Sequence, residues 1–557
     1  MTRPIVLLTV TLLTIVSAST ASAQTDREPS RITPQEIDAH LRFLSSDLLE
    51  GRAPATRGGR IAEEYIATQL QAFGVKPGVG DSSYFQRVPI DVVKADPSTI
   101  KVTASGKANA NLRFTDDVVV WPGSATDASS AHGELVFVGY GATAPEYKWD
   151  DFKGTDVRGK ILLVLVNDPP ATASEPNLFG GKAMTYYGRW TYKFEEAERR
   201  GAAGMLIVHT TERAGYPWHV VVNSNSTEHR LLPRDVPTAS GHPLPAPIGV
   251  RGWITDSAAT ALLAQAGLNM ADLRKQAESR DFRPVPTGIA IDATMRNSLQ
   301  HMSANNVIGV VRGIDPIVRD EYVAYSAHWD HFGIGPVVNG DSIYNGAVDN
   351  ASGVASILTI AHAAAEGVKS RRSQLFVFVT AEESGLLGSA YFGEHPTVPA
   401  SKIIAALNMD VVPVNGRVRD LNIMGDNKSS LGPALAQMVR SEGIRLSPDA
   451  HPEQGHFYRS DHFSFAKVGI PSISIGGGVD YVGRPAGWGL RHADDYTAHR
   501  YHQPSDEYRP DFDLSGATQL AEIVYRFGLS LGNARTIPTW NADAEFRAMR
   551  DASRKGQ

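Results

Sequence analysis

Between residues 291 and 535, short apolar runs alternate with segments of helical periodicity, and this alternation constrains the fold more than any other feature of the chain. The apolar runs read NNVIGVVRG, EYVAYSAH, QLFVFVTA, IIAALNMD, LNIMG and PSISIGGG. They are continuous, which is typical of strands whose sheet is covered by helices on both faces. We therefore expect an α/β fold with a mixed, mostly parallel central sheet flanked by helices.

The rest of the chain divides into segments of different character. Residues 31–115 are expected to form the N-terminal part of the same domain, because apolar residues three and four apart predict helices over 33–74 and short alternating strands follow. Residues 116–290 have a strand, strand, helix, strand order and no cluster of chemically active residues, which predicts an inserted β-rich domain. Residues 291–535 form the main part of the first domain, and residues 536–557 a C-terminal tail, of which Ala542 to Gln557 is polar and loosely held.

The first residues have the pattern of an export signal. Arg3 precedes an apolar run from Ile5 to Val16, which is too short to span a bilayer, and Ala21-Ser22-Ala23 fits the small-x-small cleavage pattern. We expect residues 1–23 to be a signal peptide. The mature chain should then be exported, to the periplasm or the medium, with no membrane span.

Composition excludes several classes of chemistry. The chain has 54 Lys and Arg, 60 Asp and Glu and a net charge of -6, so it lacks the basic excess of a nucleic-acid-binding protein. It has no cysteine, which rules out disulfides, cysteine nucleophiles and thiolate metal sites. Any bound metal must be held by His, Asp and Glu.

Candidate metal ligands follow the apolar strands. His328 ends EYVAYSAH, and Asp330 two residues later could accept its second N–H, as carboxylates do for metal-bound imidazoles. Asp349 lies just before a helix, where an acid acts either as an N-cap or as a carboxylate that bridges two ions. Each motif has an ordinary structural alternative, so their combination carries the argument.

Two more strands end in acids. QLFVFVTA leads into Glu382 and Glu383, whose side chains diverge, so that one can bind a metal while the other faces a bound water. IIAALNMD ends in Asp410. We expect these acids to meet His328 at one edge of the sheet, where open α/β sheets build their sites.

The last motif, RYHQPSDEY, offers His502, with Asp506 as an acceptor for its ring and with His492 and His499 as alternative ligands. The set of two histidines and three carboxylates suits two divalent ions that share one carboxylate, with zinc as the best match. Ions about 3.5–4 Å apart lower the pKa of a bridging water and polarise a carbonyl.

The motifs AHWDHFG, NGAVDNASG, TAEESGLLGS, LNMD and YHQPSDEY resemble the ordered signature of co-catalytic di-zinc aminopeptidases of the bacterial leucyl aminopeptidase type. More distant relatives of that family are glutamate carboxypeptidase, glutaminyl cyclase and the non-enzymatic transferrin receptor. SSDLLEGRAPATRGG and YRSDHFSFAKVGIPSIS also resemble it, and the resemblance covers most of residues 33–535. The stretch from GKILLVLVNDPP to GAAGMLIV is similar to a protease-associated domain. The resemblance implies the zinc exopeptidase fold.

Roles for individual residues come from this resemblance. It implies two Zn2+ ions bridged by Asp349, with one ion completed by His328 and Asp410 and the other by Glu383 and His502. It also implies a cis peptide bond after Asp349.

Four further residues receive roles in the same way. Glu382 is the implied general base and later the acid, and Asp330 orients His328. Tyr458 and His462 are two candidates for the group that contacts the substrate or stabilises the oxyanion.

The predicted function is an exported zinc-dependent aminopeptidase that hydrolyses the N-terminal bond of peptides with a free N-terminus, using a hydroxide shared by two metals and a glutamate base. One alternative is a carboxypeptidase of the glutamate carboxypeptidase type, which would need an arginine cluster to bind the substrate carboxylate. Two less favoured alternatives are a glutaminyl cyclase and an inactive binding protein. The insert is either a lid, with aromatic residues of 180–190 lining a cleft, or an appendage.

Overall fold

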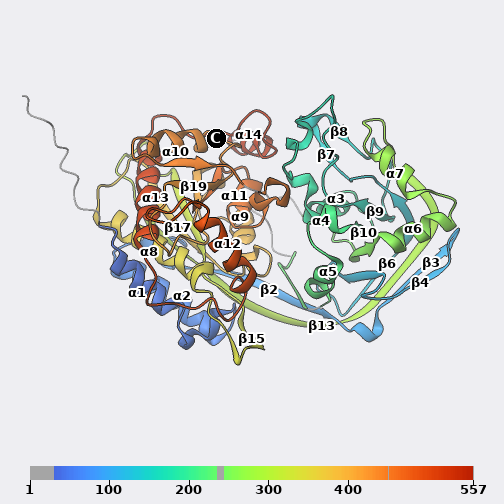
Figure 1. The fold of residues 1–557 in the computed structure, drawn as a ribbon, viewed down its shortest axis with the longest axis horizontal. Helices are drawn as coiled ribbons and strands as arrows, with labels where there is room; N and C mark the ends of the chain where they lie inside the picture. Colours follow the sequence, from blue (N-terminus) through green and yellow to red (C-terminus); the bar gives the residue numbers. More distant parts are fainter. Residues whose placement is uncertain (1–30, 227, 235–243, 450, 556–557) are drawn as a thin grey trace, which may run out of the picture. The chain divides into compact units, whose positions relative to one another are not determined.

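One long strand, β13 (Val285–Val311), belongs to two sheets and joins the two halves of the structure (Figure 1). Its residues from Asn297 onward pair with β2 (Phe85–Ala95), whereas those up to Arg296 pair with strands of the second sheet. The computed structural model describes residues 31–226, 228–234, 244–449 and 451–555, and Ile32–Gln557 form one compact unit. The predicted signal peptide lies outside the described residues.

The first sheet has a parallel centre. β14 (Tyr322–His328) lies between β17 (Ser373–Val379) and β18 (Ile403–Asn408), parallel to both, and β18 is also parallel to β21 (Ser472–Gly477). β13 pairs with β17 in the antiparallel direction, which confirms the predicted mixed, mostly parallel sheet. The remaining strands of this sheet are β1 (Lys76–Pro77), β11 (Glu228–Leu231), β19 (Asp420–Met424) and β20 (Arg445–Ser447).

Helices cover both faces of this sheet. Phe376 and its alternate neighbours pack with α1, α2, α8 and α13, whereas Leu375 and Val377 pack on the opposite side with Phe392 of α9 and Phe465 of α11. Successive side chains of a strand point to opposite faces, so continuous apolar runs are needed where both faces are buried. The helices are α1 (Pro34–Leu44), α2 (Arg57–Ala72), α8 (Ser352–Glu366), α9 (Leu387–Glu394), α10 (Leu431–Arg440), α11 (His462–Lys467), α12 (Trp488–His499) and α13 (Ser515–Asn533).

The second sheet is the predicted insert, but strand pairing extends it beyond the predicted start at residue 116. Residues 101–106 (β3) pair with β13, and residues 110–112 (β4) pair with β3. The other strands are β5 (Val118–Pro122), β6 (Ala128–Phe137), β9 (Ile161–Leu165), β10 (Gly204–His209) and β12 (Val250–Thr255). The helices that follow these strands are α3 (Trp190–Arg199), α4 (Thr211–Ala214), α5 (Trp218–Asn225), α6 (Asp256–Gln265) and α7 (Met270–Ala277). Two small hairpins complete the fold, β7 (Thr143–Ala144) with β8 (Trp149–Asp150) and β15 (Gly333–Val338) with β16 (Asp341–Tyr344).

The C-terminal tail contains two buried aromatic residues, and the expectation that Ala542 to Gln557 is loosely held is wrong for residues 542–555. The Trp540 indole is buried and donates to the carbonyl of Gly469 at 2.9 Å, and Phe546 is also buried. Arg550 of α14 (Arg547–Arg554) donates to the carbonyls of Ala400 and Ile403.

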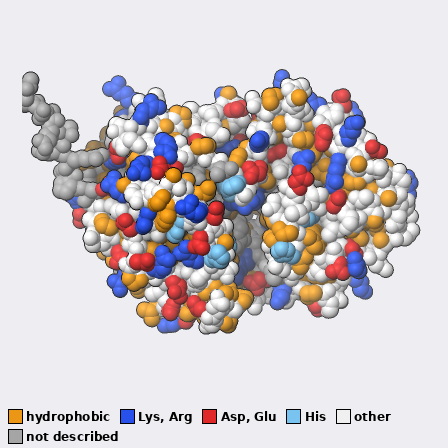
Figure 2. Space-filling model, viewed as in Figure 1, with side chains coloured by type: hydrophobic (Ala, Val, Ile, Leu, Met, Phe, Trp, Pro, Cys, Tyr) orange, Lys and Arg blue, Asp and Glu red, His pale blue; other side chains and the backbone are white. Residues whose placement is uncertain are grey.

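The surface of the drawn face mixes acidic and basic side chains over both sheets, in keeping with the small net charge (Figure 2). None of the helices in the described ranges combines the length and hydrophobicity that crossing a bilayer requires.

Trp540→Ala should lower the free energy of unfolding by about 3 kcal/mol, because it removes a buried indole and leaves a cavity. Met549→Ala in α14 is the matched control, since Met549 is 53% exposed and should change stability by less than about 0.5 kcal/mol. Urea unfolding followed by far-UV circular dichroism measures both. Equal stability of Trp540→Ala and the parent would mean that this segment does not pack on the domain.

Candidate metal centre and active site

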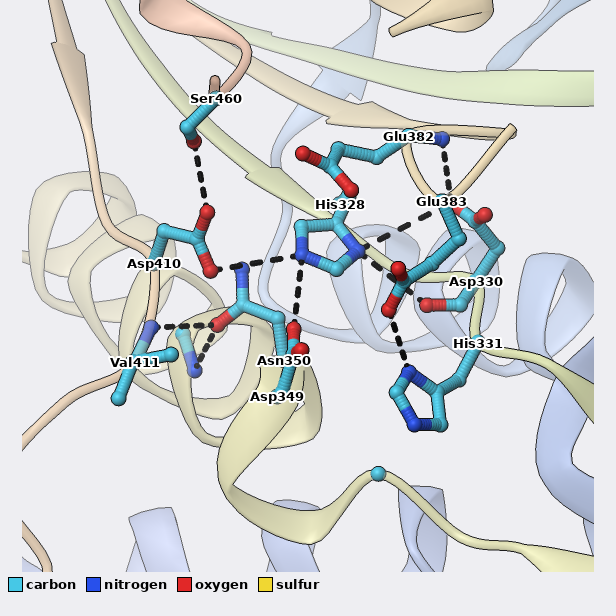
Figure 3. Close-up of polar contacts among 12 residues, drawn as sticks. His328, Asp330, His331, Asp349, Asn350, Glu382, Glu383, Asp410, Val411 and Ser460 are labelled. Atoms are coloured by element: carbon cyan, nitrogen blue, oxygen red, sulfur yellow. Dashed lines mark hydrogen bonds and ion pairs between the residues drawn. The ribbon is translucent and has the colours of Figure 1, made fainter. Parts of the chain in front are cut away.

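Three acidic or imidazole groups meet where β14 and β18 end (Figure 3). His328 is the last residue of β14 and is almost fully buried. Its Nε2 lies 3.2 Å from Oδ1 of Asp349 and 3.4 Å from Oδ1 of Asp410. Because β14 and β18 are parallel neighbours, their carboxyl ends reach the same edge of the sheet, as predicted from the strand-end residues.

A second group of three shares Asp349. Nε2 of His502 lies 3.3 Å from Oδ2 of Asp349 and 3.3 Å from Oε2 of Glu383, which follows β17 on the other side of β14. Asp349 therefore offers one carboxylate oxygen to each group.

The spacing of these atoms fits metal coordination. Ligand atoms about 2.0–2.1 Å from a tetrahedral zinc ion are separated from one another by about 3.3 Å. The distances of 3.2 and 3.4 Å around His328 and of 3.3 Å around His502 match this separation. Oxygen and imidazole nitrogen donors suit zinc, so the residues present fit two zinc ions with Asp349 between them.

The electrostatics of the cluster also favour cations. Burial raises the pKa of Glu382 and of Glu383 well above the usual range, and the neighbouring carboxylates add to the effect. Burial opposes a charge on His328, but the negative charges of Glu382 and Asp410 outweigh it and raise the pKa of His328. Divalent ions would lower the pKa values of the buried acids again, because they compensate the negative charge of the carboxylates.

The loop that carries Asp349 is held by Asp506. The Asp506 carboxylate accepts the N–H groups of Val348 at 3.1 Å and Asp349 at 3.0 Å. Asp506 was predicted to accept a hydrogen bond from the ring of His502. Its carboxylate instead accepts from the backbone of the loop that carries Asp349. The predicted cis peptide bond is confirmed between Asp349 and Asn350.

Asp330 has a different contact from the one predicted. Its carboxylate oxygen is 3.9 Å from Nδ1 of His328, whereas its backbone carbonyl is 3.2 Å away. The strand ends at His328, so the side chains of residues 328 and 330 no longer follow the alternation of an extended chain. The Asp330 carboxylate instead accepts the N–H of Glu382 at 3.1 Å and thereby positions the predicted general base.

His331 is a residue of the site that the sequence analysis missed. Its Nδ1 lies 2.6 Å from Oε1 of Glu383, opposite the oxygen that faces His502. Burial lowers the pKa of His331 to about 3, so its ring is neutral and can orient Glu383 by a hydrogen bond. The sequence feature that could have indicated this residue is the second histidine of His328-Trp329-Asp330-His331.

Arg52 was also missed, although it lies in one of the quoted motifs. Its fully buried guanidinium donates to the carbonyl oxygens of Leu44, Trp329, Asn345, Gly346 and Asp349. Burial lowers its pKa to about 10, which leaves it charged at neutral pH. Arg52 thus ties the N-terminal segment to the chain segments that carry His328 and Asp349.

The two predicted oxyanion candidates differ in their surroundings. The Tyr458 hydroxyl donates to Glu545 at 2.7 Å and accepts from Lys428 at 3.1 Å. Both of these hydrogen bonds are made to residues outside the two groups of ligands. His462 is fully buried, packs edge-on against Phe457 and lies within the electrostatic reach of Asp410.

Tyr501 is the phenol that the structure places at the cluster. Its ring stacks on His502 at 3.7 Å. Burial raises its pKa, and the charges of Asp349 and Glu383 raise it further, so its hydroxyl keeps its proton. The residue directly before His502 in RYHQPSDEY therefore lies nearer the ligands than the predicted Tyr458.

The alternative ligands His492 and His499 do not join the two groups. His492 contacts the Asn415 amide at 2.8 Å, and His499 pairs with Asp495 at 3.1 Å.

Residues 306–527, which carry every predicted metal ligand, match the model of peptidase family M28. The chain is similar to a probable leucine aminopeptidase 2 of Aspergillus oryzae, at 28% identity over 44% of this chain and 47% of that protein. It is also similar to aminopeptidase NAALADL1 of Mus musculus, at 32% identity over 23% of this chain and 16% of that protein. The matched stretches thus span less than half the length of these relatives.

Two solved structures resemble the chain over most of its length. An aminopeptidase from Aneurinibacillus sp. strain AM-1 has a TM-score of 0.47 at 19% identity, covering 90% of this chain and 94% of that one. BSAP, a zinc aminopeptidase from Bacillus subtilis, has a TM-score of 0.39 at 16% identity, covering 89% and 94%.

If each group of ligands binds one zinc ion, Asp349→Asn should reduce the bound zinc to less than one ion per chain, because Asp349 offers an oxygen to both groups, whereas His502→Ala should remove one ion. Asp495→Asn is the control, since this acid pairs with His499 and Arg500 and should leave the metal content unchanged. Inductively coupled plasma mass spectrometry of the purified, zinc-equilibrated proteins gives the stoichiometry. Equal zinc content in Asp349→Asn and the parent would contradict a shared ligand.

Proposed function

We propose that this protein is an exported zinc-dependent aminopeptidase that hydrolyses the N-terminal peptide bond of peptides with a free N-terminus. The observation that carries the proposal is the shared Asp349, which lies between two groups of ligands with a further acid, Glu382, beside them. The match of residues 306–527 to peptidase family M28 and the names of the similar proteins support it. The leader-like residues 1–23 support export to the periplasm or the medium.

Each ligand has a place in this proposal. His328 and Asp410 would hold one ion and Glu383 and His502 the other, with Asp349 between them. When bound, the two ions would lower the pKa of a water held between them and polarise the substrate carbonyl.

Glu382 moves the proton. One carboxylate oxygen of Glu382 lies within 4.8 Å of a possible ligand atom of His328 and of one of Asp410. The backbone N–H of Glu382 donates to the carboxylate of Asp330. The carboxylate of Glu382 takes a proton from the attacking water, the new C–O bond forms, and the same proton goes to the leaving amine as the C–N bond breaks.

Tyr501 and nearby apolar side chains complete the site. The protonated Tyr501 hydroxyl can donate to the oxygen of the attacked carbonyl as negative charge develops on it. Phe332, which is 41% exposed, packs edge-on against His502 at 4.7 Å, and Val411 follows Asp410 directly. This apolar rim supports a preference for an apolar residue at the N-terminus of the substrate.

Glu382→Gln should keep the zinc content and lose turnover of leucine p-nitroanilide by about 10²–10⁴-fold in kcat, because the amide cannot accept the proton of the water. Glu394→Gln, in α9, is the control, since Glu394 lies outside both groups of ligands and should retain parental turnover. If Glu382→Gln hydrolysed the anilide at close to the parental rate, the assignment of the base would be wrong.

Tyr501→Phe should lower kcat by about 10²-fold with a smaller change in KM, since the lost hydrogen bond strengthens only as the oxyanion forms. The comparison variant is Tyr391→Phe, which removes a phenol that packs against His395. Steady-state kinetics on the same anilide separates the two parameters. A purely structural role for Tyr501 would instead appear as lost zinc or lost stability.

A further inference from the structure

The loop 180–190 of the insert docks on the domain that carries the metal centre. The Tyr186 ring packs on Tyr458 at 6.1 Å and on Phe463 at 5.1 Å. The backbone N–H of Met184 donates to the carbonyl of Pro452 at 2.9 Å. Glu195 of α3 pairs with Lys467 at 2.8 Å, so this contact is both apolar and charged.

An arginine follows each of the two stacked tyrosines. Arg189 ends the short turn formed by residues 186–188, and Arg459 ends the turn formed by residues 456–458. Because Tyr186 and Tyr458 stack, the turns that carry Arg189 and Arg459 lie against each other. Burial and, second, the positive charge of Arg459 together lower the pKa of Arg189 to about 10.

These two arginines lack acidic partners within the described ranges. No ion pair or side-chain hydrogen bond is formed there by either guanidinium, and Nε of Arg189 is buried without a partner. The other guanidinium groups of the loop's helix, Arg199 and Arg200, both pair with Glu196. Two neighbouring guanidinium groups without an acid form a site for an anion, since their planar donors match a carboxylate.

Arg459 is adjacent in sequence to a residue that contacts the candidate metal centre. Arg459 directly precedes Ser460, whose hydroxyl donates to Oδ2 of the ligand Asp410 at 2.6 Å. Neighbouring Cα atoms are about 3.8 Å apart, and each residue of an extended peptide spans about 3.3–3.6 Å. A carboxylate held by the arginines therefore fits a peptide of a few residues whose first residue lies at the metals.

We propose that Arg189 and Arg459 bind the C-terminal carboxylate of a short peptide substrate, so that the insert selects tri- and tetrapeptides with a free C-terminus. This inference rests on the proposed aminopeptidase function. It gives the insert a role in substrate choice through Arg189, while the aromatic residues of the loop fix its position.

The test compares Leu-Gly-Gly with its C-terminal amide. The parent should have a KM about 10-fold or more lower for the free acid, because charge-assisted hydrogen bonds to a carboxylate are lost in the amide. Arg189→Gln and Arg459→Gln should each bring the ratio of the two KM values to near one. Arg158→Gln is the matched control, since Arg158 is an exposed arginine of the insert that pairs with Asp156, and it should keep the parental ratio.

The outcomes separate this inference from the proposed function. An equal KM for acid and amide in the parent, or an unchanged ratio in both arginine variants, would overturn the anion site. Arg459 is exposed, so Arg459→Gln reports on the site even if Arg189→Gln fails to fold. Release of glycine from the C-terminus before leucine would overturn the aminopeptidase function while the ratio of acid to amide still measures the anion site. Calorimetric binding of both peptides to Glu382→Gln gives the same comparison without turnover.

Discussion

The buried guanidinium of Arg52 is the interaction on which the metal centre depends. The ligands His328 and Asp349 come from segments that are close in space but are not paired as strands, and backbone carbonyls from both segments converge on Arg52. A buried charge is stable only when its donors are satisfied, and here carbonyl oxygens accept from it on several sides. The guanidinium also brings a positive charge near Asp349 and Asp506, which lessens the repulsion among the buried acids.

Around this candidate centre, three of the predicted ligands are held by a second group. Asp506 accepts from the backbone of the Asp349 loop, His331 contacts the free oxygen of Glu383, and Ser460 donates to Asp410. These contacts leave one oxygen or nitrogen of each ligand directed at its partners in the cluster. The arrangement is therefore preorganised for cations, because the ligands are fixed by groups that do not themselves bind metal.

The insert is joined to this domain by two independent features. β13 runs through both sheets without a break, and the loop 180–190 docks by aromatic stacking on Tyr458 and Phe463. A single strand would allow rotation at the point where it changes sheets. The contact of the loop 180–190, which lies about a hundred residues earlier in the chain than β13, opposes this rotation. This double attachment fixes the loop that carries Arg189 on the domain that carries Arg459.

The sequence by itself determined the central sheet and the meeting of His328, Glu383 and Asp410, because parallel strands must end at one edge and their last residues need no long-range information to be placed there. Only the tertiary structure decided the roles of Arg52, His331, Tyr501 and Asp506 and the early start of the second sheet. These residues act through contacts with chain segments far away in sequence, and neither periodicity nor strand-end position encodes such contacts. The same holds for Trp540 and Phe546, whose burial depends on surfaces that exist only after the domain has folded.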